Sequence, residues 1–545
     1  MSGVERRGGK MQKRTVVCFV MVLLMMCGVM LRIYQLTSGT LAQAADQQAS
    51  MTVNVASARG TIYDRNLTPL NNTGKEYRAA VTPTATAVAA LAGCLGEEEM
   101  DALSSRLQSG KPAVAVLSDP TPPAQGVTLF TVPQRYEGTL LAPHVVGYLA
   151  GDGINGAAGM ELFYNDYLKE HSGVASVTYT ADAMGRPLQG ITPEITDTLA
   201  DAQAGIALTI DADIQKIVEN AARQYIQKGA VVVTEPSTGR ILAMVSLPDF
   251  QPDTLAESLE NPDSPLVNRA LSNYNCGSVF KIVSTAAALE AGVSTSTSYN
   301  CVGSIDVGGV NFHCHNRLGH GLFNMHQAFA ESCNPYFISL MLGVGGDRLY
   351  NMAVNLGFDR PIVLADGMKT ARATMPSLES LQSPAEVANF AFGQGSLLAS
   401  PVHLAQLVGT VVNGGELVRP TLFLGTVDAD GTLHEEAPAA KQQAFSKSTA
   451  ALLKEMMVGT VEEGTGKKAK PIEGGAGAKT GTAETGWEID GHEVVQGWFA
   501  GYYPAEDPRY VVVVLAEDTD GSGGKSTPVF KQICEDLNML EKAKG

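Results

Sequence analysis

Residues 276–281 read Cys-Gly-Ser-Val-Phe-Lys, which places Ser278 three positions ahead of Lys281. On a helix, two side chains at this spacing share one face, about 5–6 Å apart. Free backbone N–H groups at the helix N-terminus would lie beside Ser278, where they suit an oxyanion. The pair therefore fits a nucleophile and its base, provided that burial or a second cation keeps the lysine neutral. An isolated pair fits an N-cap serine and a surface lysine at least as well.

A second polar stretch, Ser332-Cys333-Asn334, lies between two helical runs. A hydroxyl and a carboxamide two residues apart can flank a nucleophile, one relaying a proton and the other holding a substrate amide. We therefore expect Ser332 and Asn334 at an interhelical turn, with their side chains near Ser278 and Lys281.

A third stretch, Lys479-Thr480-Gly481-Thr482, reads as part of a strand. A cation and two hydroxyls in this arrangement can hold a carboxylate, and the glycine allows a close approach of the backbone. Each of the three stretches is a weak signal by itself. Their occurrence in this order, on a helix, a turn and a strand, is a strong signal for one site.

The elements around these stretches predict an α+β fold for residues 206–545. Residues 230–246 read as two strands joined by a Pro-Ser-Thr-Gly turn, which indicates a hairpin. Helical stretches rich in Ala, Leu and Met follow, and then three more strands and a closing helix. Strands at both ends with helices between them predict a five-stranded antiparallel sheet packed by helices.

The N-terminus contains a basic flank followed by a charge-free apolar run at residues 15–31. With the next few residues this run is long enough to span a bilayer, so we predict a cytoplasmic tail over 1–14 and a transmembrane anchor over 15–36. The positive flank would stay inside, leaving the bulk of the chain extracytoplasmic at the cell membrane. A cleaved signal peptide is the alternative, because residues 42–44 (Ala-Gln-Ala) resemble a cleavage site.

Short β-like runs alternate with turns between residues 51 and 190, and no reactive side chains gather there. This region is predicted to form a separate β-rich domain, followed by a linker over 192–205. The formal net charge of −17 disfavours nucleic acid and anionic membrane surfaces as partners of the large domains.

The ordered Ser-x-x-Lys, Ser-x-Asn and Lys-Thr-Gly stretches resemble those of the penicillin-binding serine acyl-transferases. Further stretches resemble one subgroup, the class B (monofunctional) penicillin-binding proteins: RGTIYDRN at 59–66, GAAGMELFYNDYL at 156–168 and FGQGSLLASPVHLA at 392–405. The resemblance implies a β-lactamase-like serine transpeptidase domain, preceded by a pedestal or dimerisation domain over 51–190. It also implies peptidoglycan D,D-transpeptidase activity that β-lactams inhibit.

The same resemblance implies roles for the reactive residues. Ser278 would attack the penultimate D-Ala carbonyl of a stem peptide, and Lys281 would accept its proton. Ser332 would relay a proton to the leaving amine, while Lys479 would help to keep Lys281 neutral. The family commonly has proline two positions before the serine, where this chain has Cys276. That change affects the loop more than the chemistry.

Substrate binding would fall to the other residues of the three stretches. Asn334 would contact the substrate backbone, and Thr480 and Thr482 would hold the terminal carboxylate beside Gly481. The backbone N–H groups of Ser278 and Thr482 would form the oxyanion hole. No cofactor and no catalytic metal is implied. The implied partners are stem peptides, β-lactams and a membrane-embedded glycan polymerase.

Two other functions compete with a transpeptidase. A catalytically idle scaffold of the cell-wall machinery would have no need for three intact stretches. A β-lactamase or carboxypeptidase shares them, but a secreted β-lactamase would be about half this length and would lack a pedestal. The sequence leaves open whether the protein serves elongation, division or sporulation, and it leaves open the stem-peptide chemistry and the oligomeric state.

Six cysteine and histidine residues lie close together in the sequence: Cys301, His313, Cys314, His315, His320 and Cys333. No pair has the C-x-x-C or H-x-x-x-H spacing typical of zinc sites. A disulfide between Cys301 and Cys314 is natural outside the cytoplasm, as are buried thiols. A structural zinc ion is the alternative.

Overall fold

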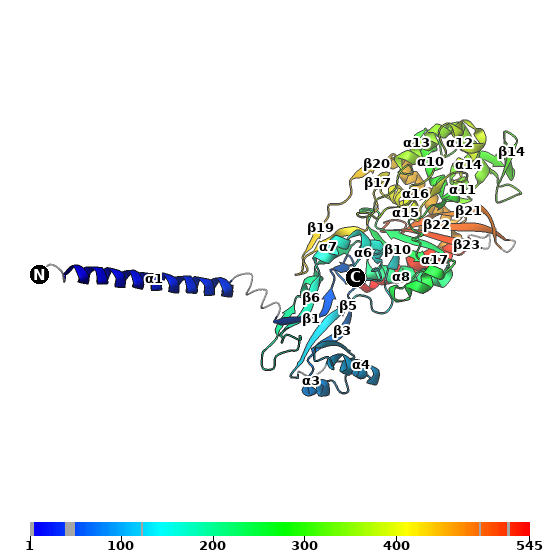
Figure 1. Cartoon of the computed structure of the whole chain (residues 1–545). Coiled ribbons are helices and arrows are strands. Elements are labelled where there is room, and N and C mark those ends of the chain that lie inside the picture. Colours follow the sequence, from blue (N-terminus) through cyan, green and yellow to red (C-terminus); the bar gives the residue numbers. More distant parts are fainter. Residues whose placement is uncertain (1–4, 39–48, 121–123, 490–491, 520–523, 545) are drawn as a thin grey trace. The chain divides into compact units, whose positions relative to one another are not determined.

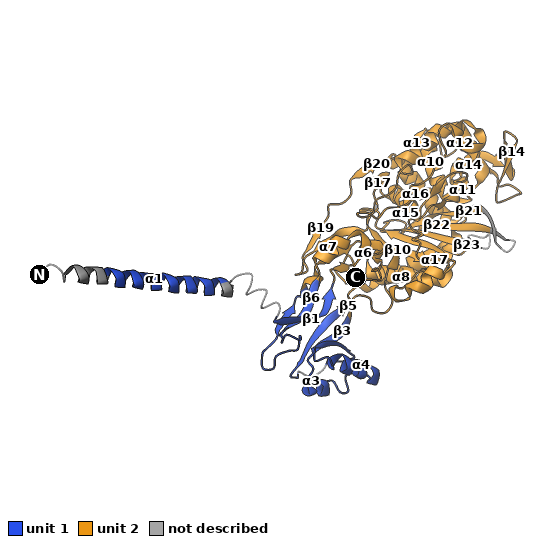
Figure 2. Cartoon of the chain, in the orientation of Figure 1, with its two compact units in different colours: residues 1–58, 75–133, 173–200 blue, residues 59–74, 134–172, 201–545 orange. Residues whose placement is uncertain are grey.

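The computed structural model describes residues 5–38, 49–120, 124–489, 492–519 and 524–544. The chain forms two compact units, each built from segments that are separated in the sequence (Figures 1 and 2). Unit 1 contains residues 1–58, 75–133 and 173–200, and unit 2 contains residues 59–74, 134–172 and 201–545. Two segments of the predicted pedestal are thus grouped with unit 2, and the domain boundaries 51–190 and 206–545 stay a prediction.

Helix α1 (Glu5–Ser38) contains the apolar run of the N-terminus. Its stretch Lys13–Gln35 is 23 residues long and none of its most apolar part is buried. A helix of that length rises about 35 Å, enough to cross a hydrocarbon core of about 30 Å. Among the described residues no other helix is long and apolar enough to span a membrane. The alternative cleavage site at 42–44 lies outside the described residues.

Unit 1 contains two small antiparallel sheets, with the strand orders β1-β6-β7 and β4-β3-β5. The elements are β1 (Ser50–Ala58), β3 (Gly74–Val81), α3 (Ala85–Ala90), α4 (Glu97–Leu107), β4 (Ala113–Leu117), β5 (Val127–Gln134), β6 (Gly173–Thr180) and β7 (Glu194–Asp197). Ala79, Val81 and Leu117 of the strands pack with Leu91 and Leu103 in a core of their own. The predicted β-rich region is confirmed.

The centre of unit 2 is a five-stranded antiparallel sheet with the order β10-β9-β23-β22-β21. Two strands come from residues 229–247 and three from residues 477–519. They are β9 (Gly229–Thr234), β10 (Ile241–Leu247), β21 (Gly477–Ile489), β22 (His492–Tyr503) and β23 (Tyr510–Thr519). This arrangement confirms the predicted α+β fold, in which distant parts of the chain supply one sheet.

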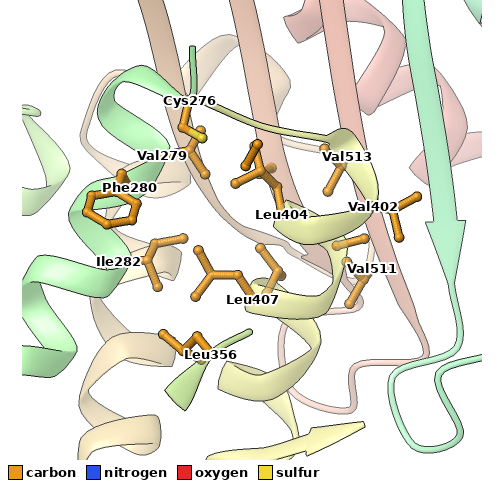
Figure 3. Close-up of a cluster of buried hydrophobic side chains, with 14 of the residues drawn as sticks. Cys276, Val279, Phe280, Ile282, Leu356, Val402, Leu404, Leu407, Val511 and Val513 are labelled. Atoms are coloured by element: carbon orange, nitrogen blue, oxygen red, sulfur yellow. The ribbon is translucent and has the colours of Figure 1, made fainter. Parts of the chain in front are cut away.

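Helices cover both faces of this sheet, which explains the unbroken valine runs of its central strands. On one face Val231 and Val512 pack with α8 (Ala212–Tyr225) and α17 (Ser526–Lys544). On the other face Val513 packs with α15 (Pro401–Val412), and Figure 3 shows the side chains of this cluster. Because both faces are buried, apolar residues do not alternate with polar ones along these strands.

The remaining helices of unit 2 surround α10 (Lys281–Glu290), which is buried over most of its length. Its contacting helices are α12 (Asn334–Val344), α13 (Gly346–Asn355) and α16 (Lys447–Glu462). Two shorter helices, α11 (Met325–Ala330) and α14 (Pro384–Ala391), complete this helical part. Ile282 of α10 points into the core beside Leu407 (Figure 3). Burial on all sides fixes α10, and with it the polar side chains at its N-terminus.

A smaller sheet of unit 2 has the order β19-β18-β8-β2. Its strands are β2 (Thr61–Tyr63), β8 (Gly205–Leu208), β18 (Phe423–Val427) and β19 (Leu433–Glu435). β2 lies parallel to β8, whereas the other pairs are antiparallel. The segment around residues 59–66 therefore adds an edge strand to unit 2.

A buried carboxylate joins the two sequence stretches at 59–66 and 156–168. Glu161, on α6 (Gly159–Phe163), is fully buried. It accepts hydrogen bonds from Arg59 at 3.0 Å, Arg135 at 2.8 Å and Tyr136 at 3.0 Å. Burial lowers the pKa of Arg59, and the Glu161 charge opposes that shift. The Glu161 carboxylate thus balances the positive charges of Arg59 and Arg135.

We expect Glu161→Gln to lower the free energy of unfolding by about 3–5 kcal/mol, because the Arg59 charge would stay buried without its partner. Thermal unfolding of the full-length protein in detergent measures the change. Glu257→Ala, at an exposed position of α9 (Leu255–Glu260), is the matched control and should shift the transition little. Equal melting temperatures for the two variants would contradict this role of Glu161.

Candidate active site

Ser278 lies in a 3₁₀ turn, η3 (Gly277–Phe280), that leads directly into α10. The two residues after it, Val279 and Phe280, are buried, whereas Ser278 is partly exposed. Gly277 has a φ of +52°, and a side chain there would lie 2.8 Å from the carbonyl oxygen of Thr482. The turn therefore requires glycine, which allows Ser278 to lie against β21.

Lys281 is fully buried and points toward the second stretch. Its Nζ donates to the Ser332 carbonyl oxygen at 2.7 Å, to Ser332 Oγ at 3.2 Å and to Asn334 Oδ1 at 2.7 Å. Burial lowers the pKa of Lys281 to about 7, and electrostatic interaction with Cys333 and Cys314 opposes that shift. The amine is therefore near the point at which it can exchange a proton at neutral pH.

Lys479 on β21 is also fully buried, and it reaches the same hydroxyl. Its Nζ donates to Ser332 Oγ at 2.9 Å and to the Thr480 carbonyl oxygen at 3.0 Å, above the ring of Phe329 at 5.7 Å. Burial lowers the pKa of Lys479 well below its usual range, and the charge of Lys281 lowers it further. Two ammonium groups around one hydroxyl repel each other, so the pair of amines readily carries at most one positive charge.

Ser332 links the three stretches through an uncommon backbone conformation. Its φ is +54°, in the left-handed region that non-glycine residues rarely adopt. Such a residue costs about 1–3 kcal/mol and persists where the surroundings require it. Here the conformation places both the hydroxyl and the carbonyl oxygen of Ser332 against Lys281. The Nδ2 group of Asn334 donates to the His313 carbonyl oxygen at 3.2 Å.

Strand β21 approaches the serine turn closely because Gly481 has no side chain. A Cβ at this position would lie 3.0 Å from Val279 Cγ2 and 3.1 Å from Trp498 Cβ. Thr480 and Thr482, two positions apart on the strand, share one face, and both line the cavity beside Ser278. The hydroxyl of Thr480 lies 2.6 Å from that of Thr465.

One cavity of about 830 Å³ contains most of the predicted site residues. Ser278, Ser332, Asn334, Thr480, Gly481 and Thr482 line it. The two lysines lie behind its wall, where they bond Ser332. All eight predicted residues are therefore brought together, and their catalytic and binding roles stay predictions.

Several lining residues were not found from the sequence, among them Asn311, Arg317, Asn389 and Thr465. Residues 311–317 come from the end of a small hairpin, and Thr465 follows α16. No motif marks these positions, because their place in the cavity depends on the packing of distant elements. Residues 392, 394 and 395, from the stretch 392–405 that resembles class B penicillin-binding proteins, also line the cavity.

Four of the cysteine and histidine residues form one cluster, and one of them, Cys314, lines this cavity. Cys301, Cys314, His320 and Cys333 have ligand atoms that all lie within 4.8 Å of one another. Cys301 and Cys314 are not joined in the disulfide that was one of the sequence's alternatives, and all eight cysteines are free of disulfides. These four residues could hold a metal ion beside the site, and His315, His320 and Glu331 form a second group of possible ligands that shares His320.

The fold and the cavity agree with comparisons to known proteins. Residues 229–535 match the family described as the penicillin binding protein transpeptidase domain, and the chain belongs to this family. The chain is 32% identical over 416 residues to stage V sporulation protein D of Bacillus subtilis, with 72% of this chain and 62% of that protein covered. It is 33% identical over 335 residues to the peptidoglycan D,D-transpeptidase PbpA of Mycolicibacterium smegmatis, covering 57% of this chain and 67% of that protein.

Solved structures give the same result. A D,D-transpeptidase domain of a peptidoglycan glycosyltransferase from Eggerthella lenta is similar with a TM-score of 0.64 and 27% identity, covering 90% of this chain and 99% of that one. Penicillin-binding protein A from M. tuberculosis, solved as a ceftriaxone acyl-enzyme complex, is similar with a TM-score of 0.56 and 30% identity over 61% of this chain and 79% of that one. The class B penicillin-binding fold expected from the sequence is confirmed.

Because the amine of Lys281 is buried, we expect the unfolding free energy of the protein to depend on pH. Its pKa is about 7 in the folded chain and about 10.4 when unfolded, so the unfolded state binds more protons between these values. Wild-type stability should therefore increase as pH rises through this window, and decrease as pH is lowered, by up to about 1.4 kcal/mol per pH unit. The difference in unfolding free energy between Lys281→Met and wild type should grow in favour of the variant as pH falls from about 10 to about 7.

Thermal unfolding of both proteins across this range measures the difference, in which the titration of groups distant from Lys281 largely cancels. Lys216→Met, at an exposed position of α8, is the control and should give a difference independent of pH. A pH-independent difference for Lys281→Met would mean that Lys281 keeps its charge in the folded protein.

Proposed function

We propose that this chain is a peptidoglycan D,D-transpeptidase that cross-links stem peptides through an acyl-enzyme on Ser278. One observation carries the proposal: Ser332 Oγ bonds the buried amines of both Lys281 and Lys479 in the wall of the cavity that Ser278 lines. Similar proteins are named peptidoglycan D,D-transpeptidases, and one has been solved with a β-lactam as an acyl-enzyme. The same chemistry would make this chain a target of β-lactams.

Acylation begins when Ser278 Oγ attacks the carbonyl of the penultimate D-Ala. The hydroxyl proton passes to the neutral amine of Lys281 as the C–O bond forms. Backbone N–H groups of Ser278 and Thr482 hold the oxyanion, and loss of such a donor typically costs about 10²–10³ in rate. The tetrahedral intermediate then expels D-Ala, whose amine takes its proton through Ser332, and the acyl-enzyme ester remains.

Deacylation reverses these proton transfers with a different amine. An amine from a neighbouring strand attacks the ester and loses a proton to Lys281, and Ser278 leaves as the alcohol. A new peptide bond joins the two strands. Because each half-reaction needs a neutral Lys281, the burial that lowers the pKa of Lys281 to about 7 supports catalysis.

Substrate recognition uses the open side of the cavity. Thr480 and Thr482 present hydroxyls on one face of β21, where the terminal carboxylate of the stem peptide can accept their hydrogen bonds. The Asn334 carboxamide lies between Lys281 and the His313 carbonyl oxygen, at the edge of the same cavity. When substrate binds, Asn334 would exchange one of these hydrogen bonds for one to the substrate backbone.

We expect Ser278→Ala to abolish covalent labelling by a fluorescent penicillin, because no ester can form. Lys281→Ala should slow labelling by about 10²–10⁴, the usual contribution of a general base. Gel fluorescence of the purified full-length protein measures both effects. Ser294→Ala, at an exposed serine after α10, is the matched control and should label like wild type.

The competing functions predict other results in the same assay. An idle scaffold would show no label that depends on Ser278. A β-lactamase would lose the label rapidly and consume penicillin in many turnovers. A carboxypeptidase would release D-Ala from a stem-peptide mimic but form no cross-linked product when an amine acceptor is added, and mass spectrometry distinguishes the two products.

We infer that α1 remains as a membrane anchor, with the bulk of the chain outside the cytoplasm. Five basic residues precede its apolar run (Arg6, Arg7, Lys10, Lys13 and Arg14), and such a flank stays on the cytoplasmic side. Stem peptides are assembled into the wall on the other side, so this orientation supports the proposed substrate. By resemblance, a membrane-embedded glycan polymerase would supply the strands, and in-membrane cross-linking through α1 followed by co-purification tests this partner.

Alkaline phosphatase fused to the C-terminus should be active in cells, because the enzyme folds only after export. Replacement of the five basic residues by glutamine should reduce that activity by weakening the orientation signal. A reporter enzyme that is active only in the cytoplasm, fused at the same position, should show the opposite pattern of activity. High activity of the cytoplasmic reporter on the unchanged chain would contradict the orientation.

A further inference from the structure

Four potential metal ligands converge from four separate elements beside the cavity, which Cys314 also lines. Cys301 ends β12 (Tyr299–Cys301), Cys314 follows β14 (Val310–His313), His320 precedes β15 (Gly321–Phe323) and Cys333 precedes α12. The three thiols are at most 2% exposed. All four ligand atoms lie within 4.8 Å of one another. Such a set of three thiols and one imidazole matches the ligands that zinc takes in structural sites.

The distances within the cluster match a tetrahedral metal site better than a disulfide. Zinc bonds of about 2.3 Å to sulfur and about 2.0–2.1 Å to nitrogen place two sulfurs about 3.8 Å apart, and a sulfur and a nitrogen about 3.5 Å apart. Cys314 Sγ lies 3.9 Å from Cys333 Sγ and 3.5 Å from His320 Nδ1. A disulfide needs about 2.05 Å between its sulfurs and would leave the third thiol without a partner.

The backbone around the cluster is shaped to bring these ligands together. Gly303 and Gly319 both have positive φ, at +94° and +81°. A side chain at Gly319 would lie 2.2 Å from the Cys301 carbonyl oxygen, and the Cys314 N–H donates to the Gly303 carbonyl oxygen at 3.0 Å. The two glycines therefore allow the loop after β14 to close over Cys301.

The segment that supplies three of the ligands has little apolar core of its own. Residues 299–323 form four strands of three or four residues each: β12, β13 (Ser304–Val307), β14 and β15. Two of its leucines, Leu318 and Leu322, are 95% and 73% exposed, whereas its Phe323 packs into the main core of unit 2. A module of this size generally needs a disulfide or a metal to hold its loops in place.

We propose that Cys301, Cys314, His320 and Cys333 bind a structural Zn²⁺ ion. The thiols bind as thiolates and release their protons to solvent, while His320 binds as the neutral imidazole through Nδ1. With four protein ligands the coordination sphere is closed, as in structural rather than catalytic zinc sites. The ion takes no part in acyl transfer.

The position of Cys333 gives this site a consequence for the proposed function, on which this step rests. Cys333 lies between Ser332 and Asn334, the two residues that accept hydrogen bonds from the Lys281 amine. Its bond to zinc would anchor the turn in which Ser332 holds a φ of +54°. Zinc would thus position Ser332 and Asn334, while Cys301, Cys314 and His320 join the hairpins to that turn.

Metal analysis of the full-length protein, purified in detergent without added metal or chelator, tests the site directly. We expect about one zinc per chain in wild type, and less than about a tenth of that in Cys301→Ser and His320→Ala. Cys94→Ser removes a thiol in unit 1, and His315→Ala removes an exposed imidazole 4.0 Å from Cys314 Sγ. Both controls should keep their zinc.

A second measurement avoids variants that fail to fold. Wild type grown with Co²⁺ should show the ligand-field bands of a tetrahedral ion and thiolate-to-cobalt charge transfer, and zinc should displace both. Wild type without bound metal after growth in zinc, a disulfide between any two of the three cysteines by mass spectrometry, or zinc retained in His320→Ala but lost in His315→Ala would each overturn the proposed site.

The readouts separate this proposal from the proposed function. Zinc content and cobalt spectra do not depend on acyl transfer, so they hold even for Ser278→Ala. Penicillin labelling then tests the positioning role: Cys301→Ser, which touches no residue of the reaction, should label at least tenfold more slowly than Cys94→Ser. Equal labelling of the two, with zinc lost from Cys301→Ser, would overturn the positioning role alone.

Discussion

The site depends on the burial of two lysine amines around one hydroxyl. Removing an ammonium from water costs several kcal/mol unless it is paired or gives up its proton. Here no carboxylate compensates Lys281 or Lys479 among the hydrogen-bond partners that the described residues supply; the partners are Ser332, the Asn334 carboxamide and backbone carbonyls. The amines reduce this cost by giving up a proton more readily, as their lowered pKa values indicate. The remaining cost must be offset by the packing of the helices and sheet of unit 2, which holds the three elements of the site together.

Much of this architecture is readable from the sequence because it depends on local patterns. The apolar runs around 231–233 and 511–514 predict strands, and their positions predict a sheet made from both ends of the region. The three-residue spacing of Ser278 and Lys281 predicts their shared turn. The grouping of 59–74 and 134–172 with unit 2 does not follow from such patterns, because it depends on β2 pairing with β8 and on Glu161 meeting Arg59.

The details of the site are set by contacts across long stretches of chain. Lys281 is 51 residues from Ser332 in sequence and Lys479 is 147 residues from it, yet both bond the same oxygen. The left-handed conformation of Ser332 has no sequence signal, since this residue type rarely adopts it. The cysteine and histidine residues were recognised as a group from the sequence, but their pairing was left open: the ligands come from four elements, so no short spacing selects among them, and the paired hairpins bring them within reach of one another.

A metal is a fitting way to hold this particular turn. Ser332 and Asn334 must face an open cavity, so the loops beside them cannot be covered by a thick apolar layer. The exposed Leu318 and Leu322 show how little core the hairpins bury. Four ligand bonds to one ion fix several loops with few residues and without bulk on the cavity side. The opposite side of the same turn is held by Lys479 from the sheet. The Ser332 hydroxyl is thus fixed between a rigid strand and a cross-linked loop, which is the precision that proton transfer over hydrogen-bond distances requires.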